Sequence, residues 1–341
     1  MDDRKQRIFW FGVATLIFVF LLWNADLNLF LEKIGRAEPL YIGLALLSGF
    51  GVLLTWTINW YNFFQVSEIK CSFMHTFKMM SAGQFLNAVT PLGQFGGQPF
   101  MAYLISSNSD TSYEKSLATV MSADLLAIIP LSTFVVSGYI YTVTVGSGAS
   151  QVTGMALVTA SLLLFGIVMG YLGWYRPGTL ENSVLITFEK ITGFIGRGSH
   201  LVDKLENRLE NVEQTFETIG NNPKAILRAL AITHTAFLFK MAAFYAVVQS
   251  LGLSINPFYI MLIIPIASTA NFSPTPGGAG TFEAVMAKLS MIFMGIGYEA
   301  ALAIGVLHRL ATYWLHLVIG YLAMNTLNLS ISDVKDVPET G

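Results

Sequence analysis

Two basic side chains stand within long apolar stretches of this sequence. Lys240 lies in residues 225–250, and Arg309 lies in residues 300–327. A charge at membrane depth costs free energy and marks either a substrate path or a paired charge. Arginine suits a phosphate because its planar guanidinium donates several hydrogen bonds in a fixed fork. We therefore expect Lys240 and Arg309 to face a wet cavity and to bind an anion.

A structural role for the same charges is the alternative. Arg309 would then pair with Glu283, or Asp124 would pair with Lys240, because charges inside a membrane protein usually find partners. His308 and His316 flank this region and could shuttle protons, but interior histidines are more often simply hydrogen-bonded. The sequence leaves both interpretations open.

A Pro- and Gly-rich break gives the second candidate site. The sequence Asn271-Phe-Ser-Pro-Thr-Pro-Gly-Gly-Ala-Gly-Thr-Phe-Glu283 separates two apolar runs, residues 258–270 and 282–294. Each run is shorter than the roughly 20 residues that cross a bilayer, and the break cannot continue a helix. Such backbone is tolerated at membrane depth only inside protein or beside a wet cavity. The pattern therefore predicts a re-entrant helical hairpin with a functional tip.

The chemistry expected at this tip is anion binding. The returning half-helix offers free N–H groups and the positive end of its dipole, glycines allow a ligand to approach the backbone, and a threonine could cap the half-helix. The candidate binding residues are Asn271, Ser273, Pro274, Pro276, Gly277, Gly278, Gly280, Thr281 and Glu283. The alternative is that these residues only shape the hairpin and support its dipole.

A related break lies earlier in the chain, at residues 90–99 between short segments 77–88 and 100–106. The same spacing separates Asn87 from Asn271, Gly93 from Gly277 and Gly96 from Gly280. Paired interruptions in matching positions of two halves point to a transporter's substrate site. The candidate binding residues here are Asn87, Pro91, Gly93, Gly96 and Gly97.

The elements around these sites predict an all-α integral membrane protein. With 54% hydrophobic and only 12% charged residues, the chain is far from a soluble composition. We expect one polytopic domain over residues 1–341, with repeat halves 8–146 and 154–327. The expected spans are residues 8–23, 39–63, 117–145 (with Pro130 as a kink), 154–175, 225–250 and 300–327. Residues 177–223 should form a cytoplasmic amphipathic helical segment.

Several functional classes are excluded or unsupported. A net charge of −2 gives no basic face for nucleic acid. The single cysteine, Cys71, excludes an internal disulfide and a cysteine-cluster metal site. No hydrolase, metalloprotease or P-loop signature is present. We expect no catalytic residues, no metal and no cofactor, and we expect the first apolar run to be a retained helix rather than a signal peptide.

Lysine and arginine placement predicts the orientation. With the N-terminus inside, nearly all basic residues outside the membrane segments fall on the inner side, and only Lys33 and Arg36 fall outside. Both termini would then be cytoplasmic in a multi-pass protein of the cell membrane. The first hairpin would enter from inside and the second from outside, which makes the halves an inverted-topology repeat.

The run Pro274-Thr-Pro-Gly-Gly-Ala-Gly-Thr-Phe-Glu283 resembles the signature of the flippase-like membrane domain of lysylphosphatidylglycerol synthetases. The resemblance covers about residues 8–327 and implies movement of an anionic lipid or a lipid-linked sugar between leaflets. The first motif fits more loosely, because Gln94 and Gln98 stand where a more charged pattern is expected. The chain resembles a stand-alone member without the aminoacyl-transferring domain, which would not charge lipids with lysine itself.

The leading hypothesis is a lipid transporter, either a flippase or scramblase-like, whose partner is an anionic phospholipid or a polyprenyl phosphate. One alternative is a membrane-embedded lipid-phosphate transferase or hydrolase that uses Glu283 and a histidine as acid and base. Another is a scaffold subunit that binds a glycosyltransferase or lipid-modifying partner through residues 177–223. A small-solute transporter or channel and a homo-oligomer also remain open.

Overall fold

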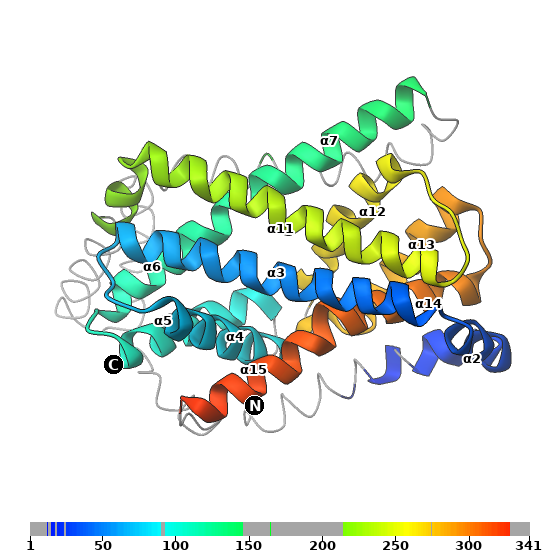
Figure 1. The fold of residues 1–341 in the computed structure, drawn as a ribbon, viewed down its shortest axis with the longest axis horizontal. Helices are drawn as coiled ribbons and strands as arrows, with labels where there is room; N and C mark the ends of the chain where they lie inside the picture. The colour runs from blue at the N-terminus through cyan, green and yellow to red at the C-terminus, as the bar shows by residue number, and fades with distance from the viewer. Residues whose placement is uncertain are drawn as a thin grey trace, which may run out of the picture.

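The computed structural model describes residues 15–17, 19–23, 25–89, 93–145, 214–273 and 275–327, together with Gly12 and Leu164. These residues form helices and connecting turns, without a β-strand among them. The principal elements are α2 (Leu27–Gly35), α3 (Pro39–Val66), α4 (Phe73–Val89), α5 (Gly93–Asn108), α6 (Tyr113–Leu126), α7 (Ile128–Thr144), α11 (Pro223–Ser250), α12 (Pro257–Thr269), η1 (Ala270–Phe272), η2 (Pro276–Gly278), α13 (Thr281–Met294), α14 (Tyr298–Arg309), η3 (Leu310–Trp314) and α15 (Leu315–Thr326) (Figure 1). The all-α prediction is confirmed.

Among the described residues, four helical stretches are long and apolar enough to cross a membrane. They are Pro39–Val66, Tyr113–Thr144, Pro223–Ser250 and Tyr298–Thr326. A fifth candidate is the pair Thr15–Trp23 and Leu27–Gly35, which is bent by 97°. The described residues thus hold four to five candidate spans. Apart from Leu164, the expected span at residues 154–175 lies outside them, as do residues 177–213 of the expected amphipathic segment.

Two long helices form the centre of the molecule. α3 and α11 lie side by side and run in opposite directions (Figure 1). Each begins with a proline, Pro39 and Pro223, which suits the first turn because its N–H would have no partner there. Gly51 allows the close contact, since a β-carbon at that position would lie 2.8 Å from the ring of Phe239. Small residues serve such helix contacts in membranes, where packing holds helices together.

The third expected span is divided in two at the predicted kink. α6 ends at Leu126 and α7 begins at Ile128. Pro130 lacks the N–H that would bond to the carbonyl of Leu126, so the helix is interrupted one turn before the proline.

Both interrupted hairpins are present, and they lie toward opposite ends of the molecule (Figure 1). α4 and α5 form the first, and α12, η1, η2 and α13 form the second. Their tips meet, because α4 and α5 both contact η2.

In the first hairpin the break is shorter than predicted. α5 begins at Gly93, so Gly93, Gly96 and Gly97 belong to its first turns; each glycine costs roughly 1 kcal/mol relative to alanine in a helix, which packing of α5 on α4 and α6 offsets.

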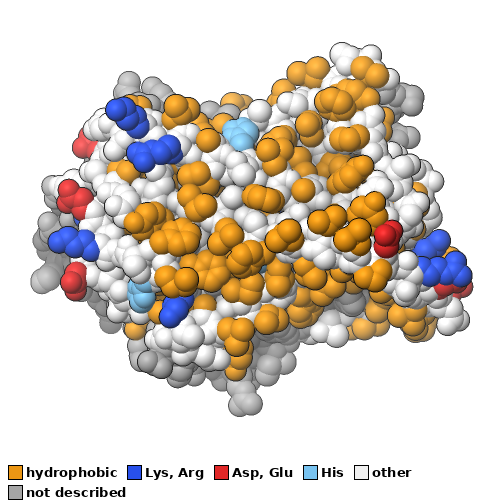
Figure 2. Space-filling view, in the orientation of Figure 1, with side chains coloured by type: hydrophobic (Ala, Val, Ile, Leu, Met, Phe, Trp, Pro, Cys, Tyr) orange, Lys and Arg blue, Asp and Glu red, His pale blue; other side chains and the backbone are white. Residues whose placement is uncertain are grey.

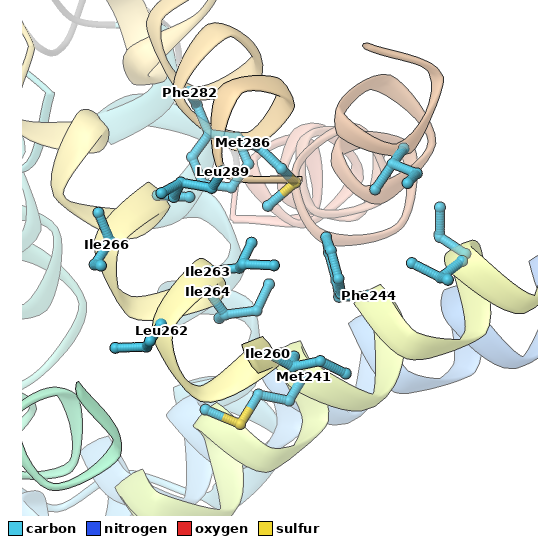
Figure 3. Packing of buried hydrophobic residues seen from close by; sticks show 14 of the residues in the cluster. Met241, Phe244, Ile260, Leu262, Ile263, Ile264, Ile266, Phe282, Met286 and Leu289 are labelled. Atoms are coloured by element: carbon cyan, nitrogen blue, oxygen red, sulfur yellow. The ribbon is translucent and has the colours of Figure 1, made fainter. Parts of the chain in front are cut away.

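A buried apolar cluster positions the second hairpin. Met241 and Phe244 of α11, Ile260, Ile263 and Ile264 of α12, and Phe282, Met286 and Leu289 of α13 converge in it (Figure 3). Helices α12 and α13 are therefore anchored on both sides of the break, and the tip between them is held against α14.

Charged side chains gather at the two ends of the long axis, with an apolar band between them on the visible face (Figure 2). Exposed large hydrophobic residues, such as Leu47 and Ile58 of α3, contribute to the apolar surface. This distribution suits a protein whose middle lies in hydrocarbon and whose ends lie in water.

Candidate functional site

Three glycines with left-handed backbone build the tip of the second hairpin. The φ angles are 55° at Gly277, 70° at Gly278 and 81° at Gly280. Other residues rarely adopt this conformation. The N-cap of α13 is Gly280, so the prediction that Thr281 caps the half-helix is wrong by one residue. Thr281 already has helical backbone, and the positive φ that the chain needs on entering α13 falls to a glycine.

Glu283 and Arg309 form a buried ion pair at this tip. Nε of Arg309 lies 3.2 Å from Oε1 of Glu283, and each residue is only 4% exposed. Oε2 of Glu283 accepts the backbone N–H of Gly280 at 2.8 Å, and Nη2 of Arg309 donates to the carbonyl of Gly277 at 2.8 Å. The pairing that the sequence left as an alternative is therefore present. This ion pair holds the guanidinium of Arg309 against the Pro- and Gly-rich break of the second hairpin.

Two aromatic rings hold the same guanidinium. It lies 3.9 Å from the ring centre of Tyr313 and 4.9 Å from that of Phe282. The hydroxyl of Tyr313 also approaches the carbonyl of Ala88, near the tip of the first hairpin, at 3.5 Å. Tyr313 thus joins both hairpin tips to Arg309. Tyr313 is not among the residues predicted from the sequence, although its place four residues after Arg309 on a helix is a signal for such a contact.

Tyr313 belongs to a segment of π-helix, η3, between α14 and α15. Such segments are rare and occur frequently at functional sites. Nε2 of His308 lies 3.3 Å from the carbonyl of Lys240, and Nε2 of His316 lies 2.8 Å from the carbonyl of Gly49. The two histidines therefore tie this helix to α11 and α3, and proton shuttling by them stays a prediction.

A cavity of about 150 Å³ lies between the two hairpins. Asn87 and Gln98 of the first hairpin and Asn271 and Gly277 of the second contribute to its wall, so both tips face one shared space. Trp56 and Trp60 of α3 add indole rings. Polar groups converging on a buried, partly aromatic wall are typical of a ligand site.

Lys240, Arg309 and Asp124 supply formal charge to the cavity wall. Nζ of Lys240 lies 4.9 Å from the ring centre of Phe237, and no carboxylate in the described part of the chain forms an ion pair with it. Asp124 accepts a hydrogen bond from Nε2 of Gln98 instead. Asp124 therefore does not form the alternative pair with Lys240. Helix α5 instead places the neutral amide of Gln98 beside Asp124.

The remaining candidate residues surround the second tip or lie elsewhere. Ser273 bonds through its hydroxyl to Thr275 at 2.8 Å. Pro276, Gly278, Gly280, Thr281 and Glu283 shape the tip without contributing to the cavity wall. Pro91 and Pro274 lie outside the described residues.

The described residues hold no cluster of three or more metal-binding side chains. Likewise, no hydrogen bond within them joins Glu283 to a histidine: its two oxygens bond to Arg309 and to the backbone of Gly280. What the arrangement offers chemically is recognition of an anion by two basic side chains and polar amides.

These features define a multi-pass α-helical membrane protein in which two interrupted hairpins meet at one buried polar cavity. The family described as the lysylphosphatidylglycerol synthase TM region matches residues 8–320, and the chain belongs to this family. The expected family relationship is confirmed.

Three archaeal relatives resemble the chain over nearly its whole length. A UPF0104 membrane protein of Pyrococcus horikoshii is 28% identical over 93% of this chain and 95% of the relative. Similar proteins of Methanothermobacter thermautotrophicus (22% identical, 89% of this chain and 90% of the relative) and Methanocaldococcus jannaschii (23%, 95% of each) also carry the name UPF0104 membrane protein. The similarity therefore extends over nearly the full length of each of these relatives.

Proposed function

We propose that the protein carries an anionic lipid headgroup between membrane leaflets, as a flippase or a scramblase-like transporter. The observation that carries the proposal is the shared cavity, in which Arg309 and Lys240 face a space between two hairpin tips. Arg309 is preorganised by Glu283, Gly277 and Tyr313. A site held in this way loses little entropy when it binds.

The guanidinium retains donors for a ligand. Its hydrogen bonds to described residues use Nε and Nη2, which leaves the N–H groups of Nη1 for a phosphate oxygen. Lys240 adds a point charge without a carboxylate partner among the described residues. A phosphodiester carries one negative charge, and both basic groups can donate hydrogen bonds to its oxygens.

The hairpins supply the path. Helix α5 contacts η2, which immediately precedes α13, and the dipole of a helix favours an anion at its positive end. We infer that the two halves have opposite topology, with the first hairpin entering from the cytoplasmic side and the second from the other side. The headgroup would pass the tips while its acyl or prenyl tails stay in hydrocarbon.

Leaflet-to-leaflet transfer in liposomes tests this function. Lys240→Met removes one charge of the cavity, and Arg309→Lys keeps the charge opposite Glu283 but loses the planar fork. A charge-assisted hydrogen bond contributes roughly 1.5–3 kcal/mol, so each change should slow transfer of phosphatidylglycerol about tenfold or more. Purified full-length protein, a fluorescent lipid and a dithionite quenching assay give the rate.

Lys288→Met is the matched control, because Lys288 is exposed on α13 outside the cavity wall. It should transfer lipid at the rate of the unmodified protein. Unchanged rates in both cavity variants, with retained folding, would exclude this cavity as the path. A polyprenyl phosphate in the same assay separates a general lipid carrier from a specialised one.

A further inference from the structure

The charges around the cavity sum to zero. Lys240 and Arg309 are positive, and Asp124 on the wall and Glu283 behind Arg309 are negative. With His308 and His316 neutral, the described groups at the site therefore have no net charge. An anionic headgroup that enters would leave one negative charge uncompensated in a buried space.

An uncompensated buried charge is costly, and protein groups commonly avoid it by binding or releasing a proton. A proton on one of the two carboxylates would restore neutrality. Both oxygens of Glu283 already accept hydrogen bonds, one from Arg309 and the other from the N–H of Gly280. Asp124 has a neutral donor, the amide of Gln98.

The partner of Asp124 can serve both protonation states. In the ionised state the Nε2 group of Gln98 donates to the carboxylate. Oε1 of the same amide is buried and has no hydrogen-bond partner among the described residues. A half-turn of the amide would let Oε1 accept the O–H of a protonated Asp124, because a glutamine side chain carries both a donor and an acceptor.

The described surroundings of Asp124 contain few other titratable groups. The sequences of α3, α5 and α7, which pack against α6, contain no Asp, Glu, Lys, Arg or His. On α11 the charged or titratable residues are Lys224, Arg228, His234 and Lys240, of which Lys240 faces the cavity. On α6 itself Glu114 and Lys115 lie in the first turn, more than two turns before Asp124. Across the cavity stand His308, Arg309 and His316.

We propose that each anionic headgroup enters the cavity together with one proton, which Asp124 carries. This proposal rests on the transport function above and adds its energy coupling. A proton from water on the entry side joins the carboxylate of Asp124, and it leaves with the headgroup on the other side. The protein is then a proton–lipid symporter whose loaded and empty cavities are both neutral.

Proton uptake on binding tests the proposal in the unmodified protein. Purified full-length protein in detergent is titrated with short-chain phosphatidylglycerol in buffers of different ionisation enthalpy, and calorimetry gives the protons bound per headgroup. We expect an uptake of about one proton with phosphatidylglycerol and none with zwitterionic phosphatidylcholine, by the charge balance above. Glycerol phosphate as a third ligand shows whether a free phosphate binds as well as a lipid.

The possible results separate the two proposals. Binding of phosphatidylglycerol without proton uptake would overturn the coupling and leave the transport function standing. If neither phosphatidylglycerol nor a polyprenyl phosphate binds, both proposals are overturned.

Variants assign the proton to a residue. Asp124→Asn should still bind phosphatidylglycerol but take up no proton, whereas Asp124→Glu should keep the uptake. Asp110→Asn is the matched control, because Asp110 is exposed in the turn before α6, and it should behave as the unmodified protein. Undiminished proton uptake by folded Asp124→Asn would overturn the assignment to Asp124. If Asp124→Asn does not fold, Asp124→Glu serves instead, and loss of proton uptake in folded Asp124→Glu would overturn the assignment.

Discussion

At the scale of single residues, Arg309 is held by contacts from three parts of the chain. Its partners are Glu283, the carbonyl of Gly277 and the ring of Tyr313. Tyr313 also packs on Gly277 so closely that a β-carbon there would lie 2.5 Å from its ring. The guanidinium of Arg309 can therefore keep its position against Tyr313 only if the residue at position 277 is small.

Gly277→Ala should disturb the site in two ways. The positive φ of 55° disfavours alanine by roughly 1–2 kcal/mol, and the added methyl pushes Tyr313 away from Arg309. We expect a lower unfolding temperature in detergent and slower transfer of phosphatidylglycerol. Gly252 has a similar φ of 67° but open space around it. Gly252→Ala should therefore lower the unfolding temperature and leave the transfer rate unchanged. Equal transfer rates in the two variants would contradict the role of the Tyr313 contact.

At the scale of elements, the π-helical segment η3 packs on α3 through Gly49. A β-carbon at Gly49 would lie 2.0 Å from the carbonyl oxygen of Ala311, and the carbonyl of Gly49 accepts a hydrogen bond from Nε2 of His316 at 2.8 Å. Gly320 makes a similar close contact with Ser81 of α4. The helix that carries Arg309 and Tyr313 is thus positioned by backbone contacts that need glycine.

Gly49→Ala should separate α3 from η3, since neither backbone can yield as a flexible side chain would. Overpacking of this kind costs roughly 1–3 kcal/mol, and we expect a lower unfolding temperature together with slower transfer. Gly43→Ala lies in the same helix with nothing within 4 Å, and it should be neutral or slightly stabilising. Thermal unfolding of both purified variants makes the comparison, and similar stabilities would contradict the packing argument.

At the scale of the whole molecule, the two hairpins lie toward opposite ends and meet near the middle (Figure 1). Charged groups collect at both ends (Figure 2). This arrangement supports the proposal of two halves that enter the membrane from opposite sides. The charge distribution along the sequence favours an orientation with both termini in the cytoplasm.

Labelling of single cysteines checks the orientation. In a Cys71→Ser background, Arg36→Cys and Lys70→Cys place one thiol at each end of α3, and both positions are exposed. In right-side-out vesicles a membrane-impermeant maleimide should label Arg36→Cys, and it should label Lys70→Cys only after the vesicles are opened. The reverse pattern would overturn the proposed orientation, whereas labelling of both without opening would show that α3 does not cross the membrane.

The sequence by itself determined the class of protein and the two interrupted hairpins, and it singled out Lys240 and Arg309 as candidate site residues. These follow from local properties: apolar length, the inability of prolines and glycines to continue a helix, and the cost of Lys240 and Arg309 at membrane depth. The sequence also offered the pairing of Arg309 with Glu283 as an alternative, without deciding it.

The tertiary structure alone decided which groups meet. It paired Asp124 with Gln98 instead of Lys240, placed Tyr313 between the hairpin tips, and began α5 at Gly93. These outcomes depend on contacts between helices far apart in the chain, where packing overrides local preference. The cavity that both hairpins share has the same origin, because the spacing of residues along a chain does not fix the distance between two helices.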